Sequence, residues 1–292
     1  MPSRSFAPLL LSTPPRPTRA ARRLAVLLLC GAATVTGSTS RLPLAAAQAK
    51  PGPAAAKPAG STAAIEPLES FTLAQATAGL KGSGPLVATI DLEQNKKPLA
   101  SLRCELFAEL TPNTVAHFVG LARGLRPFVA PESREPKKWV RRPLYDGSWL
   151  HRLLPDYLIQ GGDPNCAALH ECGGMYGQGD AGFSIPDELR PELRFDRGGR
   201  LALANKGPGT GSTQFFITER PTPWLNNTAT IFGQCEPAAA ISNIARLPTK
   251  PMNLPQDPVI IKHITIGYSG SPAGTPAAVG TGKAAQNPLR KP

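Results

Sequence analysis

Short apolar runs of strand length follow one another between residues 84 and 268, and turn residues separate them. The clearest case is 84–109 (GPLVATIDLEQNKKPLASLRCELFAE), which is typical of two strands around a polar turn because apolar and charged residues alternate from Leu102 to Leu106. Further strands are predicted at about 148–153, 157–161, 200–205, 213–218, 229–234 and 259–266. No strand–helix–strand alternation accompanies them. The pattern therefore favours a mainly β fold, a closed antiparallel eight-stranded β-barrel capped by two α-helices.

The two capping helices are predicted at 109–124 and 237–247. In the first, Thr111 suits the N-cap, Pro112 suits the first helical position, and Gly124 marks the end. Its apolar residues fall on one face, as in a helix that packs against a core. A shorter helix is expected at 73–80, before the first strand.

Composition separates a folded domain from two non-globular ends. The 33 prolines and 28 glycines of the 292-residue chain are unevenly spread. Residues 50–65 are a Pro/Ala-rich linker, and 269–292 form a low-complexity tail that is expected to be disordered. The domain is expected at 66–268, with its core at 84–268 and a Pro-, Arg- and Lys-rich surface insertion at 125–143. About 200 residues are enough to bury a sizeable core.

The net charge of +12 resides mostly in the two ends. Residues 1–50 carry seven Lys or Arg and no acid, and residues 268–292 carry three and no acid. The stretch between them has 22 basic and 20 acidic residues, a net charge of only +2. Because a nucleic-acid-binding domain needs a basic surface on its folded part, no nucleic-acid partner is predicted.

The N-terminus predicts export. Arginines at positions 19, 22 and 23 precede an apolar run over 24–33, and Ala47-Gln48-Ala49 offers the small residues that a signal peptidase prefers. We therefore predict a signal peptide at 1–49, cleaved before Lys50, and an exported protein of the bacterial cell envelope, periplasmic or secreted. The apolar run is too short to span a membrane, so no stable membrane insertion is expected after its removal.

Three alternatives stay open for this segment. Lipid anchoring at Cys30 is less favoured, because the residue before it is not small. Arg22-Arg23 could belong to a twin-arginine signal, although the flanking residues match poorly. The third alternative is a disordered N-terminus without a targeting role.

Four cysteines remain after signal cleavage: Cys104, Cys166, Cys172 and Cys235. Cys166 and Cys172 bracket a five-residue loop, so a disulfide is expected between them in an exported protein. Cys104 and Cys235 sit in apolar strand-like runs and are expected to be buried thiols. A metal site that adds His170 to the loop cysteines is disfavoured, because structural zinc normally takes four ligands.

Two segments carry the candidate chemistry, WLHRLLPDYLIQGGDP (149–164) and RLALANKGPGTGSTQFFITE (200–219). The first places the cation Arg152 near Gln160, and the second supplies Gln214. A cation, amides and large apolar side chains can form a shallow pocket that polarises a bound amide without attacking it. Isomerisation of a prolyl peptide bond needs this combination, and it needs no nucleophile, metal or cofactor. Neither metal nor cofactor is therefore predicted.

The same segments resemble the cyclophilins. Residues 149–164 are similar to the family's Phe-His-Arg pattern followed by an aromatic, an apolar residue and Gln-Gly-Gly. Residues 200–219 are similar to its Met-Ala-Asn and Ser-Gln-Phe-Phe segment, and 224–233 to its Trp-Leu…Phe-Gly segment. The resemblance covers about 84–268.

The resemblance implies a cyclophilin-like barrel, peptidyl-prolyl cis-trans isomerase activity and proline-containing polypeptide clients. It implies that Arg152 has the catalytic role. The residues that it places at peptide-binding positions are Tyr157, Leu158, Gln160, Ala204, Asn205, Gln214, Phe216, Trp224 and Leu225. A monomer that assists protein folding in the cell envelope is expected.

Several positions depart from the family pattern. Tyr157 stands for Phe, Leu158 for Met and Thr213 for Ser, Lys206 adds a charge where Ala is frequent, and Ala229 stands where many members have His. The loss of that His is expected to change substrate binding more than the chemistry. The alternative function is a cyclophilin-like peptide-binding or chaperone module with little catalysis.

Overall fold

The computed structural model describes residues 70–131, 137–168 and 176–270. The predicted signal peptide (1–49), the linker (50–65) and nearly all of the tail (269–292) lie outside these residues, so those predictions stand as made. None of the helices in the described ranges is long and apolar enough to cross a membrane.

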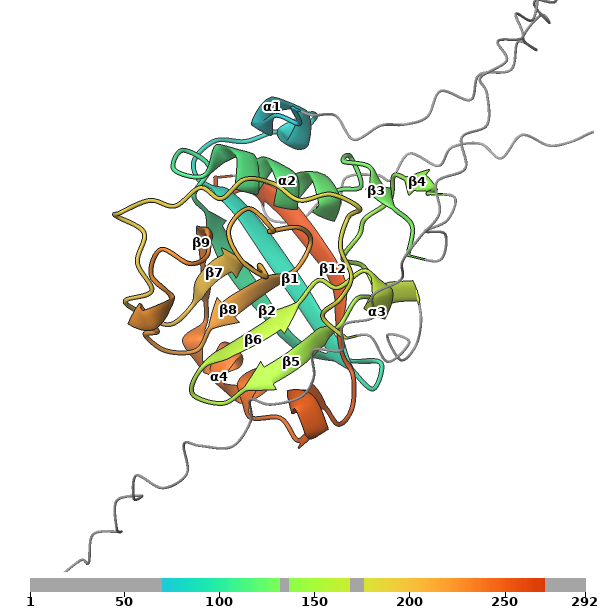
Figure 1. The fold of residues 1–292 in the computed structure, drawn as a ribbon, viewed down its shortest axis with the longest axis vertical. Helices are drawn as coiled ribbons and strands as arrows, with labels where there is room; N and C mark the ends of the chain where they lie inside the picture. Colours follow the sequence, from blue (N-terminus) through green and yellow to red (C-terminus); the bar gives the residue numbers. More distant parts are fainter. Residues whose placement is uncertain (1–69, 132–136, 169–175, 271–292) are drawn as a thin grey trace, which may run out of the picture. The chain divides into compact units, whose positions relative to one another are not determined.

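The domain is built on one eight-stranded antiparallel sheet with the strand order β12-β1-β2-β9-β7-β8-β6-β5 (Figure 1). Its strands are β1 (Leu86–Gln94), β2 (Lys97–Leu106), β5 (Leu150–Leu154), β6 (Leu158–Gly161), β7 (Arg200–Leu203), β8 (Phe215–Thr218), β9 (Ile231–Glu236) and β12 (Val259–Tyr268). Two small two-stranded sheets pair β3 (Phe128–Val129) with β4 (Trp139–Val140) and β10 (Thr249–Lys250) with β11 (Leu254–Pro255). The mainly β prediction is confirmed.

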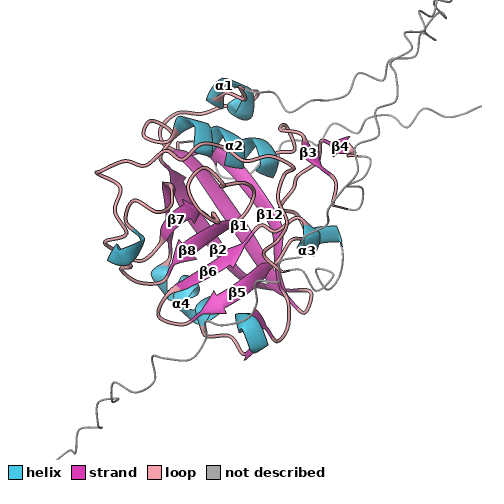
Figure 2. Ribbon diagram, in the orientation of Figure 1, coloured by secondary structure: helices cyan, strands magenta, loops and turns pink. Residues whose placement is uncertain are grey.

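Helices lie at both ends of this sheet, with α2 at one end and α4 at the other (Figure 2). The α-helices are α1 (Leu73–Thr77), α2 (Pro112–Ala122), α3 (Asn165–Ala168) and α4 (Ala238–Ala245), and the 3-10 turns are η2 (Pro223–Leu225) and η3 (Pro251–Asn253). The predictions at 109–124 and 237–247 correspond to α2 and α4, each shorter than expected at both ends.

The sheet is curled, but it is not the closed barrel that the sequence predicts. Its edge strands β5 and β12 form no ladder in the described chain, and the residues just before β5 meet β12 at one bridge, between Trp149 and Ile260. Next to that bridge the Ile261 amide donates to the Ser148 carbonyl over 2.7 Å. A register irregularity in the β5–β6 pair follows between Leu150 and Arg152. Such an irregularity bends a strand, and the two edges separate there.

Alternation along the strands separates a main core from the opposite face of the sheet. Leu153 of β5, Ile159 of β6 and Ile217 of β8 point into the main core, which α2 covers. Phe118 of α2 is fully buried there, and its ring centroid lies 5.1 Å from that of Phe232 and 5.7 Å from that of Phe215. Each such aromatic contributes about 1.5–3 kcal/mol by burial.

A distant carboxylate caps the N-terminus of α2. Thr111 occupies the predicted N-cap position, but its hydroxyl donates to the Phe107 carbonyl at 3.2 Å and makes no cap bond. Glu188 instead accepts from the backbone amides of Thr114 at 2.7 Å and Asn113 at 3.2 Å. Negative charge is favourable at this end of a helix, so Glu188 ties its loop to α2.

The 125–143 segment is only partly the surface insertion that the sequence predicts. Phe128, Val129 and Ala130 are buried, and the amide of Val129 in β3 donates a hydrogen bond to the Ala181 carbonyl. Arg126 is also buried, with its guanidinium 4.7 Å from the centroid of the Phe183 ring. The segment therefore packs inward through both its apolar residues and Arg126.

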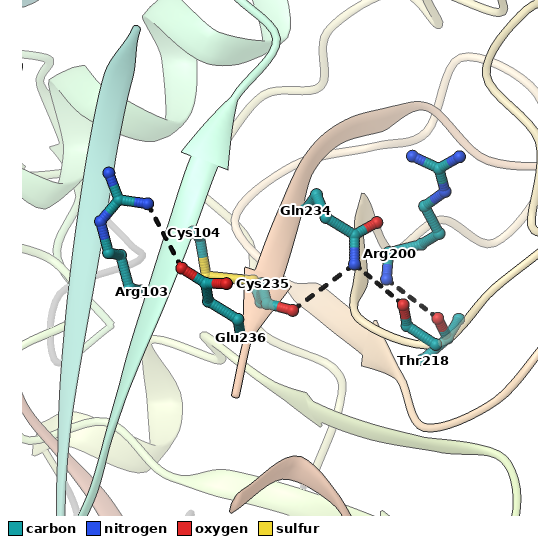
Figure 3. The surroundings of a disulfide bond; sticks show 8 residues. Arg103, Cys104, Arg200, Thr218, Gln234, Cys235 and Glu236 are labelled. Atoms are coloured by element: carbon teal, nitrogen blue, oxygen red, sulfur yellow. Dashed lines mark hydrogen bonds and ion pairs between the residues drawn. A yellow bond between two sulfur atoms is a disulfide. The ribbon is translucent and has the colours of Figure 1, made fainter. Parts of the chain in front are cut away.

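Cys104 and Cys235 form a disulfide between β2 and β9 (Figure 3). The two residues are directly opposite each other in the β2–β9 register, so the prediction that they are buried thiols is wrong. Their separation of 131 residues hid the pairing from local pattern. Cys166 is buried at the start of α3, whereas Cys172 lies outside the described residues, so the Cys166–Cys172 disulfide stays a prediction.

Reduction should destabilise the domain through the Cys104–Cys235 bridge, because closing so long a loop removes entropy from the unfolded chain. We expect the free energy of unfolding in urea to fall by about 2–4 kcal/mol when reductant is added. The Cys104→Ala/Cys235→Ala variant should show the lower stability already without reductant, and it should lose this part of the response. An equal response to reductant in both chains would show that this bridge carries no stability.

Folding buries His117 of α2 in its neutral form. Its Nε2 donates to the Ser212 carbonyl at 2.9 Å. Burial, followed by the charge of Arg126, lowers the pKa of His117 to about 3. The unfolded chain, with an ordinary pKa of about 6.5, therefore binds one more proton between these two values. The free energy of unfolding must fall as the pH drops from about 6.5 toward 3, by up to about 1.4 kcal/mol per pH unit.

A His117→Gln variant should lose this dependence. In urea unfolding between about pH 7 and pH 4, its free energy of unfolding should fall less steeply than that of the unmodified chain. His263→Gln, a change at a part-buried ring beside Asp146, controls for the loss of a histidine. Identical slopes for the unmodified chain and His117→Gln would contradict the assignment.

Candidate functional site

One row of side chains crosses four strands on the face opposite the main core. Arg152 of β5 is paired in register with Gln160 of β6, Gln160 with Phe216 of β8, and Phe216 with Ala202 of β7. Residues directly opposite each other in antiparallel strands point to the same face. The row therefore places a cation, an amide and an aromatic ring side by side.

A second apolar cluster lies beside this row and is separate from the main core. Phe216 stacks on the fully buried Phe195, with centroids 5.8 Å apart and planes at 16°. The buried members of this cluster are Leu158, Phe195, Ala202, Phe216, Ala229 and Ile231, and Phe107, Leu154, Tyr157, Leu193, Ala204 and Leu225 pack against it. The cluster gives the site a rigid apolar wall.

Three side chains form a hydrogen-bonded chain that we call the amide relay. Arg152 Nη1 donates to Gln160 Oε1 at 3.4 Å. Gln160 Nε2 donates to Gln214 Oε1 at 3.1 Å, and Gln214 Nε2 donates to the Gly179 carbonyl at 2.9 Å. Gln214 is buried, whereas Arg152 is exposed. The relay thus leads from a loop carbonyl inside the protein to a guanidinium that a ligand can reach.

Aromatic and backbone groups form the rim. Trp224 is 63% exposed, and its ring centroid lies 5.9 Å from that of Tyr157. The Asn205 side chain donates to the Thr228 carbonyl at 2.7 Å. This bond ties the loop after β7 to the segment that carries Trp224. Lys206 is exposed, with its Nζ 3.0 Å from Gln178 Oε1.

The turn between β5 and β6 is held from outside the site. The Asp156 amide donates to Glu219 Oε2 at 2.6 Å. The Asp156 carboxylate accepts from Arg246, the residue just after α4, at 2.8 Å. Arg246 and Ser242 both reach Glu219 Oε1. These contacts fix the hairpin that carries Arg152 at one end and Tyr157 at the other.

His151, next to Arg152 in β5, is a neutral buried ring. It is 3% exposed, and burial lowers the pKa of His151, against the opposing effect of the Asp163 carboxylate. Arg152 is thus the cation of this strand that faces outward.

A cavity of about 450 Å³ lies beside the loop that leads to Gln214. It is lined by Val129, Lys137, Asp180, Gly182, Phe183, Ser184, Thr210 and Ser212. None of the site residues predicted from the sequence lines it, although the 125–143 segment contributes part of its wall.

The structure brings the sequence-predicted side chains to one region. Arg152, Gln160 and Gln214 meet in the relay, Tyr157 meets Trp224, and the second apolar cluster contains or contacts the others apart from Asn205. Asn205 joins through the Thr228 carbonyl. Their roles toward a substrate stay predictions.

Sequence reasoning missed several contributors to this region, among them Phe195, Ile231 and Gly179. Phe195 and Ile231 build the apolar wall, and Gly179 ends the relay. Phe195 stands in a stretch without strand or helix periodicity, and Gly179 stands in a Gly-rich loop that predicts flexibility alone. Ile231 lies in a predicted strand, but the pattern does not say which cluster it joins.

Comparisons with known proteins agree with this geometry. A family model described as cyclophilin type peptidyl-prolyl cis-trans isomerase matches residues 89–266. Peptidyl-prolyl cis-trans isomerase A of Mycobacterium tuberculosis is 38% identical over 182 residues, which cover 61% of this chain and 92% of that protein. Peptidyl-prolyl cis-trans isomerase B of Streptomyces anulatus is 40% identical over 169 residues, 56% of this chain and 90% of that protein.

Among solved structures, a cyclophilin type peptidyl-prolyl cis-trans isomerase of Cryptosporidium parvum has 27% sequence identity and a TM-score of 0.49, covering 62% of this chain and 97% of its own. The family model spans more than half of the present chain and includes every residue of the row, the second apolar cluster and the relay. The chain belongs to the cyclophilin-type peptidyl-prolyl cis-trans isomerases, enzymes that catalyse rotation about the peptide bond before proline.

Proposed function

We propose that this enzyme isomerises Xaa-Pro bonds in proteins of the bacterial cell envelope, with Arg152 as the catalytic cation. The observation that carries the role of Arg152 is the row across β5, β6 and β8. It sets the guanidinium beside Gln160 and places Phe216 of the apolar wall next in line. A proline ring seated on the second apolar cluster would then lie within reach of the cation.

The chemistry asks for electrostatic stabilisation of a twisted amide. Resonance holds the peptide bond with a barrier of about 18–20 kcal/mol. As the bond twists, the prolyl nitrogen becomes pyramidal and regains a lone pair, which the Arg152 guanidinium can stabilise by donating a hydrogen bond. This interaction strengthens toward the transition state, so it raises the rate and not merely the affinity.

The remaining side chains would hold the peptide while its acyl part rotates. The wall of Phe216, Leu158 and Leu225 suits the proline ring, and the exposed Trp224 offers an aromatic edge to the substrate peptide. The Gln214 amide and the backbone at Asn205 would anchor the strand of substrate. Ala229 is buried in the wall, so the missing His changes the shape and polarity of this pocket rather than the cation.

Removing the guanidinium should abolish most of the rate acceleration. Arg152→Ala should lower kcat/KM for a short Xaa-Pro peptide by about 10²–10³-fold, as expected for the loss of one transition-state donor. Arg103→Ala, which removes an exposed arginine of β2 that pairs with Glu236 of β9, is the matched control and should keep full activity. Retention of activity within a few-fold in Arg152→Ala would reject Arg152 as the catalytic residue.

The same assay separates catalysis from peptide binding alone. Titration of the peptide measures affinity, and exchange between cis and trans forms measures turnover. Binding without acceleration by the unmodified chain would favour the alternative of a peptide-binding or chaperone module, for which the apolar wall without a His is the supporting feature.

Two features support action outside the cytoplasm. The N-terminus carries the sequence pattern of a signal peptide, and the Cys104–Cys235 disulfide suits an oxidising compartment. Clients would be proline-containing polypeptides that fold after export.

Export predicts a defined mature N-terminus. When the full chain is expressed in a bacterial host, N-terminal sequencing of the protein from the envelope fraction should begin at Lys50. An Ala47→Asp/Ala49→Asp variant should accumulate as the longer precursor, because the peptidase needs small residues there. An unprocessed chain in the cytoplasmic fraction would contradict export, and a lipid-modified terminus at Cys30 would contradict the cleavage site.

A further inference from the structure

The amide relay has one direction, and its two ends agree on it. The Arg152 guanidinium can only donate hydrogen bonds, and the Gly179 carbonyl can only accept them. Between these ends, each glutamine must turn its oxygen toward Arg152 and its NH₂ toward Gly179. A reversed amide would set donor against donor or acceptor against acceptor. The Gly179 carbonyl and the Arg152 guanidinium therefore require the same amide orientation, and the place of that carbonyl holds Gln214 and, through it, the side chain of Gln160.

The Asp163 carboxylate holds Gly179 in that place. The Gly179 amide donates to Asp163 Oδ2 at 3.2 Å, and Asp163 Oδ1 accepts from the Asn165 amide at 2.8 Å. Asp163 is fully buried. A Cβ atom at position 179 would lie 1.9 Å from Asp163 Oδ1, so the carboxylate packs directly against a backbone that admits no side chain.

Asp163 also stands close to the start of the relay along the chain. It follows Gln160 by three residues, two positions past the end of β6, after Gly162 turns the backbone with a φ of 82°. Backbone from Gln160 to Asp163 and hydrogen bonds through Gly179 and Gln214 back to Gln160 thus close a ring. Arg152 is attached to this ring at one point, Gln160 Oε1.

We propose that Asp163 is a positioning residue for Arg152, acting through Gly179, Gln214 and Gln160 without touching the substrate. Loss of the carboxylate frees Gly179, and the two amides then lose the acceptor that orients them. This inference rests on the proposed role of Arg152.

The test is a double-mutant cycle in the full chain. Asp163→Asn leaves one acceptor oxygen for the two backbone amides and sets an NH₂ group against the other, and we expect kcat/KM for an Xaa-Pro peptide to fall by about 10–100-fold. In a Gln214→Ala background, where the relay is already cut, the same change should cost less than about twofold. Equal losses in the two backgrounds would overturn the proposal, because Asp163 would then act independently of the relay.

Glu188→Gln is the matched control. Glu188 likewise accepts from two backbone amides, at the N-terminus of α2, and its hydrogen bonds in the described chain go to Asn113, Thr114 and Thr230, outside the relay. It should lower stability while leaving the side-chain NH₂ signals of Gln160 and Gln214 in nuclear magnetic resonance spectra unchanged. Asp163→Asn should shift both signals. The proposal fails if Asp163→Asn loses activity with these signals in place.

A reciprocal measurement leaves Asp163 intact and serves if Asp163→Asn does not fold. Coupling between two ends of a network is mutual, so Gln160→Ala should shift the Gly179 amide signal and leave that of Thr114, bound to Glu188, unchanged. An unmoved Gly179 signal would overturn the proposal. These spectra report on the relay even if Arg152→Ala keeps its activity, so failure of the catalytic assignment can be told from failure of the relay.

Discussion

The antiparallel register of β5, β6, β8 and β7 is the constraint on which both the core and the site depend. Because successive side chains of a strand point to opposite faces, Arg152 and Gln160 face the site while Leu153 and Ile159 face the main core. A slip of one residue would exchange these two sets. It would bury a guanidinium and expose aliphatic side chains, so the burial of the core holds the row in place.

Local features of the site could be predicted from the sequence, and long-range ones could not. Phe215 and Phe216 are neighbours that must point apart, and they lie in the main core and the second apolar cluster, as alternation predicts. Glu188 reaches α2 from 74 residues away. Phe195, which stacks on Phe216, lies in a stretch whose sequence has neither strand nor helix periodicity. Edge pairing is a property of the whole sheet and not of single strands. The strand patterns therefore predicted a closed barrel, whereas in the described chain the two edges meet at one bridge.

The two halves of the site are supported by different forces. The apolar wall rests on burial, which is not directional and tolerates changes such as Leu158 in place of Met. The polar half rests on hydrogen bonds whose donors and acceptors must alternate from Gly179 to Arg152. A conservative change in a loop can therefore disturb the cation more than a larger change in the wall.

The Cys104–Cys235 bridge encloses in one covalent loop all the residues assigned to the site, from Arg152 to Leu225. A protease that cut the backbone once anywhere in that loop would leave its two fragments joined by the sulfurs. The strands of the site would then stay tethered to β2 and β9. The two fragments of the nicked enzyme would separate only where a reductant breaks this disulfide.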